Sequence, residues 1–476
     1  MHDAYPRRAV MQYNHFTGHE KARIFNGGQG PEGDRFYQPT EKRGLMADSR
    51  LMRNVSIVGT SSLKQFSFDQ PEWAGYSMYE PWACAVSQAL EDANIRPNDV
   101  EKISYSQFAY FPTMGHICAP VNYLEEWAGL AGKPISHIEQ ACASGYIAFT
   151  EAVQAIASGE YDVVLVAGLE CPKFFVPIDE PAYRVKPLSE YKEFWHPGVA
   201  LFDCGHARFD GASDILLPDE NGFYYKEFYG LKDEAFIDEA YAHMAINQRR
   251  GAVRNPRSLD YGTSKDYSEV AAAEGFASDV EYLLSPKNYK ITQFTRKAGA
   301  VMHNCAAGAL VLMSDEAIKK YGVQNRPIRV IDYAAASLSP RKPWCFHNMN
   351  VEVRKQLDKN GFFKPEEMDL LITTCMSSGE QTDSAEVFGY IPEGQGLQYE
   401  IDHRTAFDGD TPINPHGGDC QWGHAMGCSG VNMISEAVFQ MRGTAGDSQV
   451  QKDIKKTLVR GMGGGHTTVG IILQNA

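Results

Sequence analysis

The chain has 476 residues, of which 43% are hydrophobic and 22% charged, and its formal net charge is −15. This length exceeds what one hydrophobic core usually holds, so we expect two core domains and an insertion. The acidic balance argues against broad binding to nucleic acid or to an anionic membrane, and no apolar stretch is long enough for a membrane span.

The N-terminus lacks the charged-then-apolar pattern of a signal segment, so we expect a cytoplasmic protein. The ten cysteines do not follow the paired spacing of a disulfide framework, and we interpret them as reduced thiols. Neither a Cys-x-x-Cys pair nor a zinc-binding spacing of histidines occurs, so the sequence predicts no metal site.

The predicted elements fall into four segments in chain order. Residues 1–50 form an N-terminal extension with loop composition around the glycines of 27–33. A first half, 51–171 with 295–320, and a second half, 327–476, each alternate short apolar runs with helical patterns, which is typical of parallel βαβ units. Residues 172–294 are rich in aromatics and interrupt the first half as an insertion, which returns to the sheet through 306–312.

Both halves show the same order of elements. Each begins with a strand, continues through a helix that ends near a proline to a second strand, and then has a small-residue turn, a helix and a closing strand. The pairs that we match are the strands 55–59 and 328–332, the helices before Pro97 and Pro365, the strands 100–105 and 368–373, and the closing strands 163–166 and 467–473.

A fixed offset of 285 residues relates the turn and helix of the two halves. It places Ser144-Gly145 on Ser429-Gly430 and Glu151-Ala152-Val153 on Glu436-Ala437-Val438. Recurrence of one turn and one helix indicates two structurally equivalent halves. If the halves pack about a pseudo-twofold axis, the two turns meet at one site.

Cys142 lies in the first turn, Ala141-Cys142-Ala143-Ser144-Gly145, directly before the amphipathic run 146–158. The partial positive charge at a helix start lowers the pKa of a thiol, and small neighbours let a substrate carbonyl approach. The backbone N–H of the cysteine can then point at a developing oxyanion. A buried, inert cysteine fits the same pattern, so the residues of this turn leave both interpretations open.

The second turn contains a base, because Trp422-Gly423-His424-Ala425-Met426-Gly427 places His424 in the turn that mirrors that of Cys142. The glycine run Gly461-Met462-Gly463-Gly464-Gly465 can approach closely and present N–H groups to an oxyanion. A structural histidine and a tight turn are the alternative interpretations.

Together these motifs resemble the thiolase superfamily over residues 51–476. The resemblance rests on Cys142, Ile413-Asn414-Pro415-His416-Gly417-Gly418, Gly423–Gly430 and the terminal glycine run. The stretch 380–396 is similar to the sterol-carrier-protein-type and archaeal branch. The resemblance implies an α/β thiolase fold, duplicated in five layers as α/β/α/β/α, with 172–294 as an inserted loop domain that binds CoA, and at least a homodimer.

The thiolase pattern also implies roles for the motif residues. Cys142 would be the nucleophile that takes the acyl group as a thioester, and His424 would activate it and donate to the carbonyl of the enolate-forming substrate. The oxyanion hole would be built from backbone amides of Cys142, Gly463, Gly464 and Gly465. Coenzyme A would be a co-substrate, with no covalently bound cofactor.

Further positions are candidates for the same site. Asn414 belongs to the Asn-Pro motif, and His416 stands where the family usually has serine. A basic cluster in the insertion is a candidate for CoA binding, although a solvated helix face would have the same composition; its residues are Arg249, Arg250 and Arg254.

The chain departs from the thiolase pattern at the acid/base group. Many thiolases carry a cysteine just before the terminal glycines, where this chain has Gly461. In the sterol-carrier-type branch that cysteine lies in a His-Asp-Cys-Phe-like motif, and here Thr373-Thr374-Cys375-Met376 stands in its place. We therefore expect Cys375 to be the acid/base and the Thr374 hydroxyl to hold the oxyanion-hole water that the missing histidine would hold.

These departures are similar to those of thiolase-like proteins that act with a small zinc-ribbon and OB-fold subunit, such as benzoylsuccinyl-CoA thiolase. The resemblance implies a C-acyltransferase that cleaves a 3-oxoacyl-CoA or related β-keto thioester with CoA, or runs the reverse Claisen condensation. An aromatic acyl group would suit the aromatic-rich insertion. The alternatives are a CoA-independent acyltransferase of this fold and a non-catalytic thiolase-like binding subunit.

Overall fold

The structure is a computed structural model that describes residues 49–66, 79–107, 125–170, 213–259, 261–262, 264–291, 293–301, 304–338, 344–463 and 467–476. The predicted N-terminal extension therefore lies outside the described residues, apart from Ser49 and Arg50.

Within the described residues, one mixed sheet has the strand order β3-β2-β4-β5-β1-β6-β9-β8-β7. The strands are β1 (Val55–Ser62), β2 (Lys102–Ser106), β3 (Ile135–Ile138), β4 (Val163–Glu170), β5 (Ala306–Ser314), β6 (Ile328–Ser337), β7 (Leu370–Thr373), β8 (Lys456–Gly463) and β9 (Thr467–Asn475). β2 pairs in parallel with β3 and β4, and β7 pairs in parallel with β8. The parallel pairs at both ends of the sheet confirm that βαβ units build each half.

The two halves join at the middle of the sheet through β1 and β6. These equivalent first strands pair antiparallel over only two residue pairs, Ser56 with Arg329 and Ile57 with Ile328. An antiparallel contact between two equivalent strands is what a twofold relation between the halves requires. The sheet is therefore two half-sheets linked at one short seam.

One predicted correspondence between the halves was wrong. β4 pairs in parallel with β2 and antiparallel with β5, and β8 has the same relation to β7 and β9. The counterpart of 163–166 is therefore β8, and 467–473 in β9 corresponds to β5. The apolar pattern was misleading because β8 contains Arg460, which is fully buried and ion-paired with Glu380.

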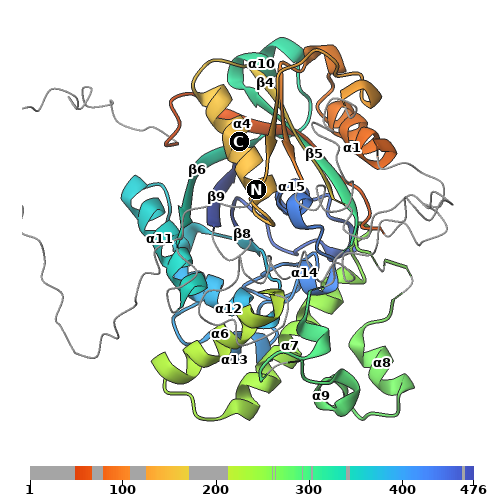
Figure 1. Ribbon diagram of the computed structural model, residues 1–476, viewed down its shortest axis with the longest axis vertical. Coiled ribbons are helices and arrows are strands. Elements are labelled where there is room, and N and C mark those ends of the chain that lie inside the picture. The colour runs from red at the N-terminus through yellow and green to blue at the C-terminus, as the bar shows by residue number, and fades with distance from the viewer. Residues whose placement is uncertain are drawn as a thin grey trace, which may run out of the picture. The chain divides into compact units, whose positions relative to one another are not determined.

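The described helices cover the sheet and build the insertion (Figure 1). The α-helices are α1 (Tyr79–Asp92), α4 (Ser144–Ala157), α6 (Ser213–Phe228), α7 (Glu234–Ala252), α8 (Tyr267–Ala273), α9 (Asp279–Leu284), α10 (Asp315–Tyr321), α11 (Cys345–Asn360), α12 (Ser378–Val387), α13 (Gly396–Ile401), α14 (Gly418–Gln421) and α15 (Met426–Arg442). Short 3₁₀ turns lie at Pro97–Asp99, Pro286–Asn288, Lys297–Gly299, Pro365–Glu367 and Gly446–Ser448. None of these described helices is both long and apolar enough to cross a bilayer.

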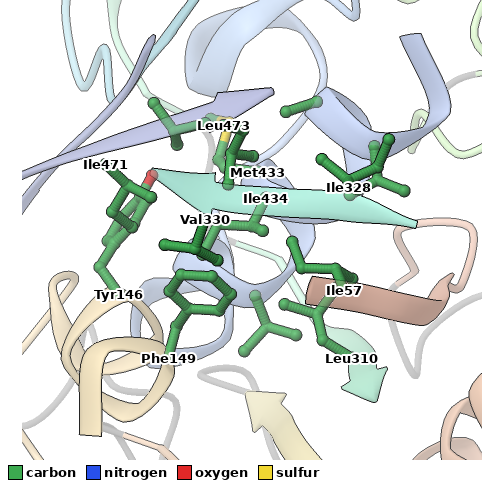
Figure 2. Close-up of a cluster of buried hydrophobic side chains, with 14 of the residues drawn as sticks. Ile57, Tyr146, Phe149, Leu310, Ile328, Val330, Met433, Ile434, Ile471 and Leu473 are labelled. Carbon is green, nitrogen blue, oxygen red and sulfur yellow. The ribbon is translucent and has the colours of Figure 1, made fainter. Parts of the chain in front are cut away.

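Three hydrophobic clusters define the layers. α1 packs on the outer face of the first half-sheet, and α11 packs on the outer face of the second. Between the two half-sheets lies the largest cluster, to which α4 contributes Phe149 and α15 contributes Ile434 (Figure 2). The order α1, first half-sheet, α4 with α15, second half-sheet, α11 confirms the five-layered fold.

The two central helices owe their position to their composition. α15 buries every residue from Met426 to Val438, and α4 buries nine of its fourteen. α15 is therefore covered all round, whereas α4 keeps a partly exposed side that carries Glu151 and Gln154. Both helices lie in the middle layer, and the residues that precede them come together there.

The described part of the insertion is helical. The Asp233 side chain caps the start of α7 by accepting the Ala235 N–H at 3.0 Å. Its end lies against the second half, because a Cβ on Gly251 would come within 2.2 Å of the Pro415 carbonyl oxygen. β5 then returns the chain to the first half-sheet, as predicted.

Candidate active site

A tight turn places Cys142 just before α4. Ala141 has a left-handed φ of 48°, which lets the chain reverse before the helix begins. The Ser144 hydroxyl accepts the Gln140 N–H at 2.8 Å and donates to the Ala141 carbonyl at 2.5 Å. The turn is thereby fixed by its own side chain, and Cys142 is 7% exposed.

The second turn brings His424 to the same place from the other half. Gly423 has a φ of +125°, a conformation that few side chains tolerate, and the Asn304 N–H donates to the His424 carbonyl at 3.2 Å. His424 Nε2 lies 3.0 Å from Cys142 Sγ. The two equivalent turns therefore meet, and each contributes one reactive side chain.

A third residue, Asp419 of α14, completes a chain of hydrogen bonds. Its Oδ1 lies 2.7 Å from His424 Nδ1, and its Oδ2 accepts the Cys375 N–H at 2.7 Å. The Ser429 hydroxyl also lies 3.1 Å from His424 Nδ1. Because a carboxylate only accepts hydrogen bonds, Nδ1 carries a proton and Nε2 faces the thiol. The arrangement is a Cys-His-Asp triad.

The charges of this triad support one another. Burial is the largest influence on His424 and would lower its pKa, but Cys142 and Asp419 together raise the pKa of His424 well above its usual range. The geometry therefore favours an imidazolium between a thiolate and a carboxylate. A thiolate is the nucleophilic form of cysteine.

Apolar side chains surround the thiol. Cys142 belongs to a buried cluster that Val301 and Leu338 extend and that is rich in sulfur-containing residues; its other members are Cys345, Phe346, Met349, Met376, Met426 and Met462. Ala141, which directly precedes Cys142, and the cluster member Met426 have left-handed backbone, with φ of 48° and 33°. Such strained residues gather at functional sites.

The glycine run approaches the Cys142 turn as a close backbone contact. A Cβ on Gly463 would lie 2.3 Å from the Ala143 nitrogen and 2.4 Å from the Gln140 carbonyl oxygen. Only glycine allows β8 to end this close to the turn. Gly464 and Gly465 lie outside the described residues, so the oxyanion hole stays a prediction.

Cys375 and Thr374 lie behind the triad, at the end of β7. The Cys375 thiol donates to the Ser377 carbonyl at 3.1 Å and accepts from Gln248 Nε2 at 3.2 Å. The Thr374 hydroxyl lies 2.9 Å from the Tyr146 hydroxyl. The roles of Cys375 as acid/base and of Thr374 in the oxyanion hole stay predictions.

Asn414 and His416 are both buried, and their place in the active site stays a prediction. The Asn414 amide brackets the end of β7, accepting the Thr373 N–H at 2.8 Å and donating to the Thr373 carbonyl at 2.9 Å. The His416 ring is fully buried and meets Trp422 edge to face at 5.0 Å. Burial lowers the pKa of His416 to about 4, so the ring is neutral.

The three arginines predicted to bind CoA lie at the end of α7. Arg250 and Arg254 both approach the Phe407 ring, at 5.6 and 5.3 Å, and Arg250 pairs with Asp408 at 2.5 Å. Arg249 lies over Tyr267 at 5.7 Å. They form a cationic and aromatic surface, and their role in binding CoA stays a prediction.

Comparison with known families accounts for this architecture. Residues 70–171 match the thiolase N-terminal domain and residues 336–475 the thiolase C-terminal domain-like family, and together these segments cover just over half of the chain. The chain belongs to the thiolase family. This confirms the family resemblance and the fold that it implied.

Two curated relatives extend the thiolase match over most of the chain. The acetyl-CoA acetyltransferase of Methanothermobacter thermautotrophicus is 24% identical over 407 residues, which cover 84% of this chain and 94% of the relative. The benzoylsuccinyl-CoA thiolase subunit BbsB of Thauera aromatica is 25% identical over 396 residues, 80% of this chain and 89% of the subunit.

Two further proteins belong to the same comparison. Human sterol carrier protein 2 is 24% identical over 420 residues, 84% of this chain and 68% of that protein. Among solved structures, the Ltp2-ChsH2(DUF35) aldolase superposes with a TM-score of 0.62 at 19% identity, over 89% of this chain and 98% of that chain. This last likeness concerns the fold.

Asp419 is the site residue that sequence reasoning missed. It directly follows the Asn-Pro-His-Gly-Gly motif of this thiolase and lies five residues before His424. A carboxylate in a stretch of glycines and apolar residues is costly to bury unless it is paired. That isolated charge, so close to a candidate catalytic histidine, was the available signal.

Proposed function

We propose that this thiolase-family acyltransferase cleaves a 3-oxoacyl-CoA or related β-keto thioester with CoA, or forms it by the reverse Claisen condensation, through an acyl-enzyme on Cys142. The observation that carries the proposal is the 3.0 Å contact between Cys142 Sγ and His424 Nε2, made by residues from opposite halves. Such a contact supplies an activated thiol nucleophile.

In the cleavage direction, the Cys142 thiolate attacks the keto carbon. The carbon–carbon bond then breaks, and the leaving fragment departs as the enolate of an acyl-CoA, which takes up a proton. The thiol of CoA loses its proton, and its sulfur attacks the Cys142 thioester to collect the acyl group. Backbone amides of Cys142 and of the glycines from Gly463 onward would hold the developing oxyanion.

The surroundings of Cys142 favour a large apolar acyl group. Methionine side chains are flexible and polarizable, so the cluster formed by Met349, Met376, Met426 and Met462 can adjust to an occupant. Trp344 directly precedes this cluster in the chain and meets Phe228 and Tyr224 edge to face, at 5.4 and 5.8 Å between ring centroids. We propose that aromatic acyl groups are among the substrates.

CoA would bind through the arginines at the end of α7, close to the second-half loop that α7 contacts. Replacing Arg254 by alanine is expected to raise the KM for CoA on the order of tenfold, as expected when a charged hydrogen bond is lost. Arg404→Ala is the matched control, because Arg404 pairs with Asp410 on the surface at 2.9 Å. An unchanged KM for CoA in Arg254→Ala would place CoA elsewhere.

A partner subunit is part of the proposal. One relative is named as a subunit, and one solved structure of this fold is named as a two-component aldolase. We propose a homodimer that pairs with a small zinc-ribbon and OB-fold protein. Co-purification from the native source followed by zinc analysis tests this proposal. A purified particle that has the mass of two chains and contains no zinc would show that the small subunit is not part of the complex.

The first experiment measures intact protein mass after incubation with a panel of acyl-CoA and 3-oxoacyl-CoA thioesters. Wild type is expected to gain the mass of an acyl group and to lose it again when CoA is added. Cys142→Ser should gain nothing, whereas Cys84→Ser, which removes an exposed thiol, should behave as wild type.

The same experiment separates the rival functions. An acyl adduct on Cys142 that CoA does not remove would favour the CoA-independent acyltransferase. The absence of an adduct with every thioester, also in the presence of the partner subunit, would favour a binding subunit without turnover.

A further inference from the structure

The His424–Asp419 pair is built as a proton-handling unit. Both side chains are fully buried, and Asp419 is held at both oxygens, at 2.7 Å by His424 and at 2.7 Å by the Cys375 amide. We infer that this pair is the acid/base group of the site, with His424 as the catalytic residue and Asp419 as the residue that positions it. The inference rests on the proposed function. It assigns to His424 the proton transfers that a second catalytic cysteine performs in other thiolases.

At neither position where thiolases keep an acid/base cysteine does this chain have a free thiol. A Cβ on Gly461 would lie 2.2 Å from Cδ2 of Tyr146, so that position has no room for any side chain. The Cys375 thiol is fully buried and is already bonded to the Ser377 carbonyl and to Gln248. Cys375 contacts the Asp419 carboxylate through its backbone N–H and not through its thiol.

One imidazole can carry the proton through both half-reactions. In the resting site His424 holds two protons beside the Cys142 thiolate. When the thiolate adds to the keto carbon and the carbon–carbon bond breaks, the Nε2 proton moves to the α-carbon of the leaving enolate. Neutral His424 then takes the proton of the CoA thiol, whose sulfur attacks the thioester and releases the Cys142 thiolate beside the imidazolium. No proton is gained or lost over the cycle, and no outside acid is needed.

Asp419 makes this cycle feasible because it stabilises the positive state of His424. The pKa of His424 lies well above its usual range, with burial opposing the rise and Cys142 and Asp419 producing it. Other titratable groups also lie around the pair. These are Tyr146 of α4, Glu170 of β4, Cys375, Glu380 of α12, His416, Cys420 of α14 and Arg460 of β8.

The test is the pH dependence of Cys142 alkylation by iodoacetamide, read by peptide mass, which requires no knowledge of the substrate. Replacing Asp419 by asparagine should shift the alkylation profile of Cys142 to higher pH by about one to three units, the effect of losing an opposite charge beside the imidazolium. Asp383→Asn is the matched control, because Asp383 bonds a second histidine, the partly buried His347, at 2.6 Å. This control should leave the profile unchanged.

Wild type provides an independent criterion if Asp419→Asn folds poorly. Its Cys142 should be alkylated well below the pH of an ordinary thiol, whose pKa is about 8.5. A wild-type profile centred near that value, or an Asp419→Asn profile that coincides with wild type, would overturn the inference.

Turnover of acetoacetyl-CoA with CoA separates His424 from Cys375 as the acid. Cys375→Ser should retain turnover, and Asp419→Asn should lose it on the order of 100-fold or more, the usual contribution of general acid–base catalysis. If Cys375→Ser still forms the acyl adduct but loses turnover, Cys375 is the acid and the inference is wrong. If no variant and no wild type forms an adduct, the proposed function fails, while the alkylation profiles still judge the role of Asp419.

Discussion

Gly145 of α4 and Gly430 of α15 lie in direct backbone contact, and they are equivalent residues of the two halves. A Cβ on Gly145 would lie 2.9 Å from the Gly430 Cα, and one on Gly430 would lie 2.8 Å from the Gly145 carbonyl carbon. Contact between two equivalent positions places the pseudo-twofold axis between them. It also allows the two turns that precede these helices to come within hydrogen-bonding distance.

Replacing Gly145 by alanine is expected to destabilise the protein by about 1–3 kcal/mol. The added Cβ would lie 2.6 Å from the Val431 nitrogen, and backbone cannot move aside as a side chain would. This clash outweighs the gain of up to about 1 kcal/mol in helix propensity. Urea denaturation measures the difference. Gln154→Ala, an exposed change on the same helix, should stay within about 0.5 kcal/mol of wild type.

A cysteine at position 461, where many thiolases carry one at the equivalent place, is expected to destabilise the protein and not to add a working acid/base group. Gly461→Cys is expected to cost about 1–3 kcal/mol because the new Cβ would overlap the Tyr146 ring. In a Tyr146→Val background the same change should cost less, with a coupling of about 0.5–3 kcal/mol. Strictly additive costs in the double-mutant cycle would contradict the steric argument.

The buried Arg460–Glu380 ion pair should be far more sensitive than a surface pair. Removing the arginine leaves the Glu380 carboxylate buried without its counter-charge, so Arg460→Met is expected to lose about 3–5 kcal/mol. Arg404→Met, which breaks the exposed pair with Asp410, should lose at most about 1 kcal/mol. Equal losses in chemical denaturation would show that the buried pair is compensated in another way.

His416 should make the protein less stable in acid. The folded protein keeps the ring neutral down to a pKa of about 4, whereas the unfolded chain takes up a proton near the usual value of about 6.5. Between these values the unfolded state binds more protons, so stability falls as the pH falls, by at most about 1.4 kcal/mol per unit.

His416→Leu checks this prediction. Neither ring nitrogen of His416 has a hydrogen-bond partner among the described residues, so leucine sacrifices no such bond. The variant should lose less stability than wild type between pH 6.5 and pH 4 in urea denaturation. If the two proteins lose the same amount, His416 is not the group that titrates.

The sequence predicted the parts of the fold that repeat or follow a simple period. The offset that places Ser144-Gly145 on Ser429-Gly430 predicted two equivalent halves, and α4 and α15 confirm it. The closing strands were mismatched because Arg460 interrupts the apolar pattern of β8. Its partner Glu380 lies in another element, 80 residues away, so pairing of these charges was not visible in the local pattern.

The site residues that belong to sequence motifs could be predicted, whereas those that join the site only through tertiary contacts could not. The meeting of the two turns followed from the duplication. Asp419 contacts His424 only because α14 and the loop after it fold the four intervening residues into a compact arc. The packing of Gly461 against Tyr146 joins β8 to α4, and no local pattern reports such a contact.

The twofold relation between the halves is broken at the two reactive positions. The offset that joins Gly145 to Gly430 places Cys142 on Gly427 and Glu139 on His424. The first half therefore has the thiol without the imidazole, and the second half has the imidazole without the thiol. Two copies of a single half could not differ in this way, because every substitution would appear in both. Joining the halves in one chain allowed each copy to diverge separately. A nearly symmetric fold can then place two different reactive side chains at one asymmetric site.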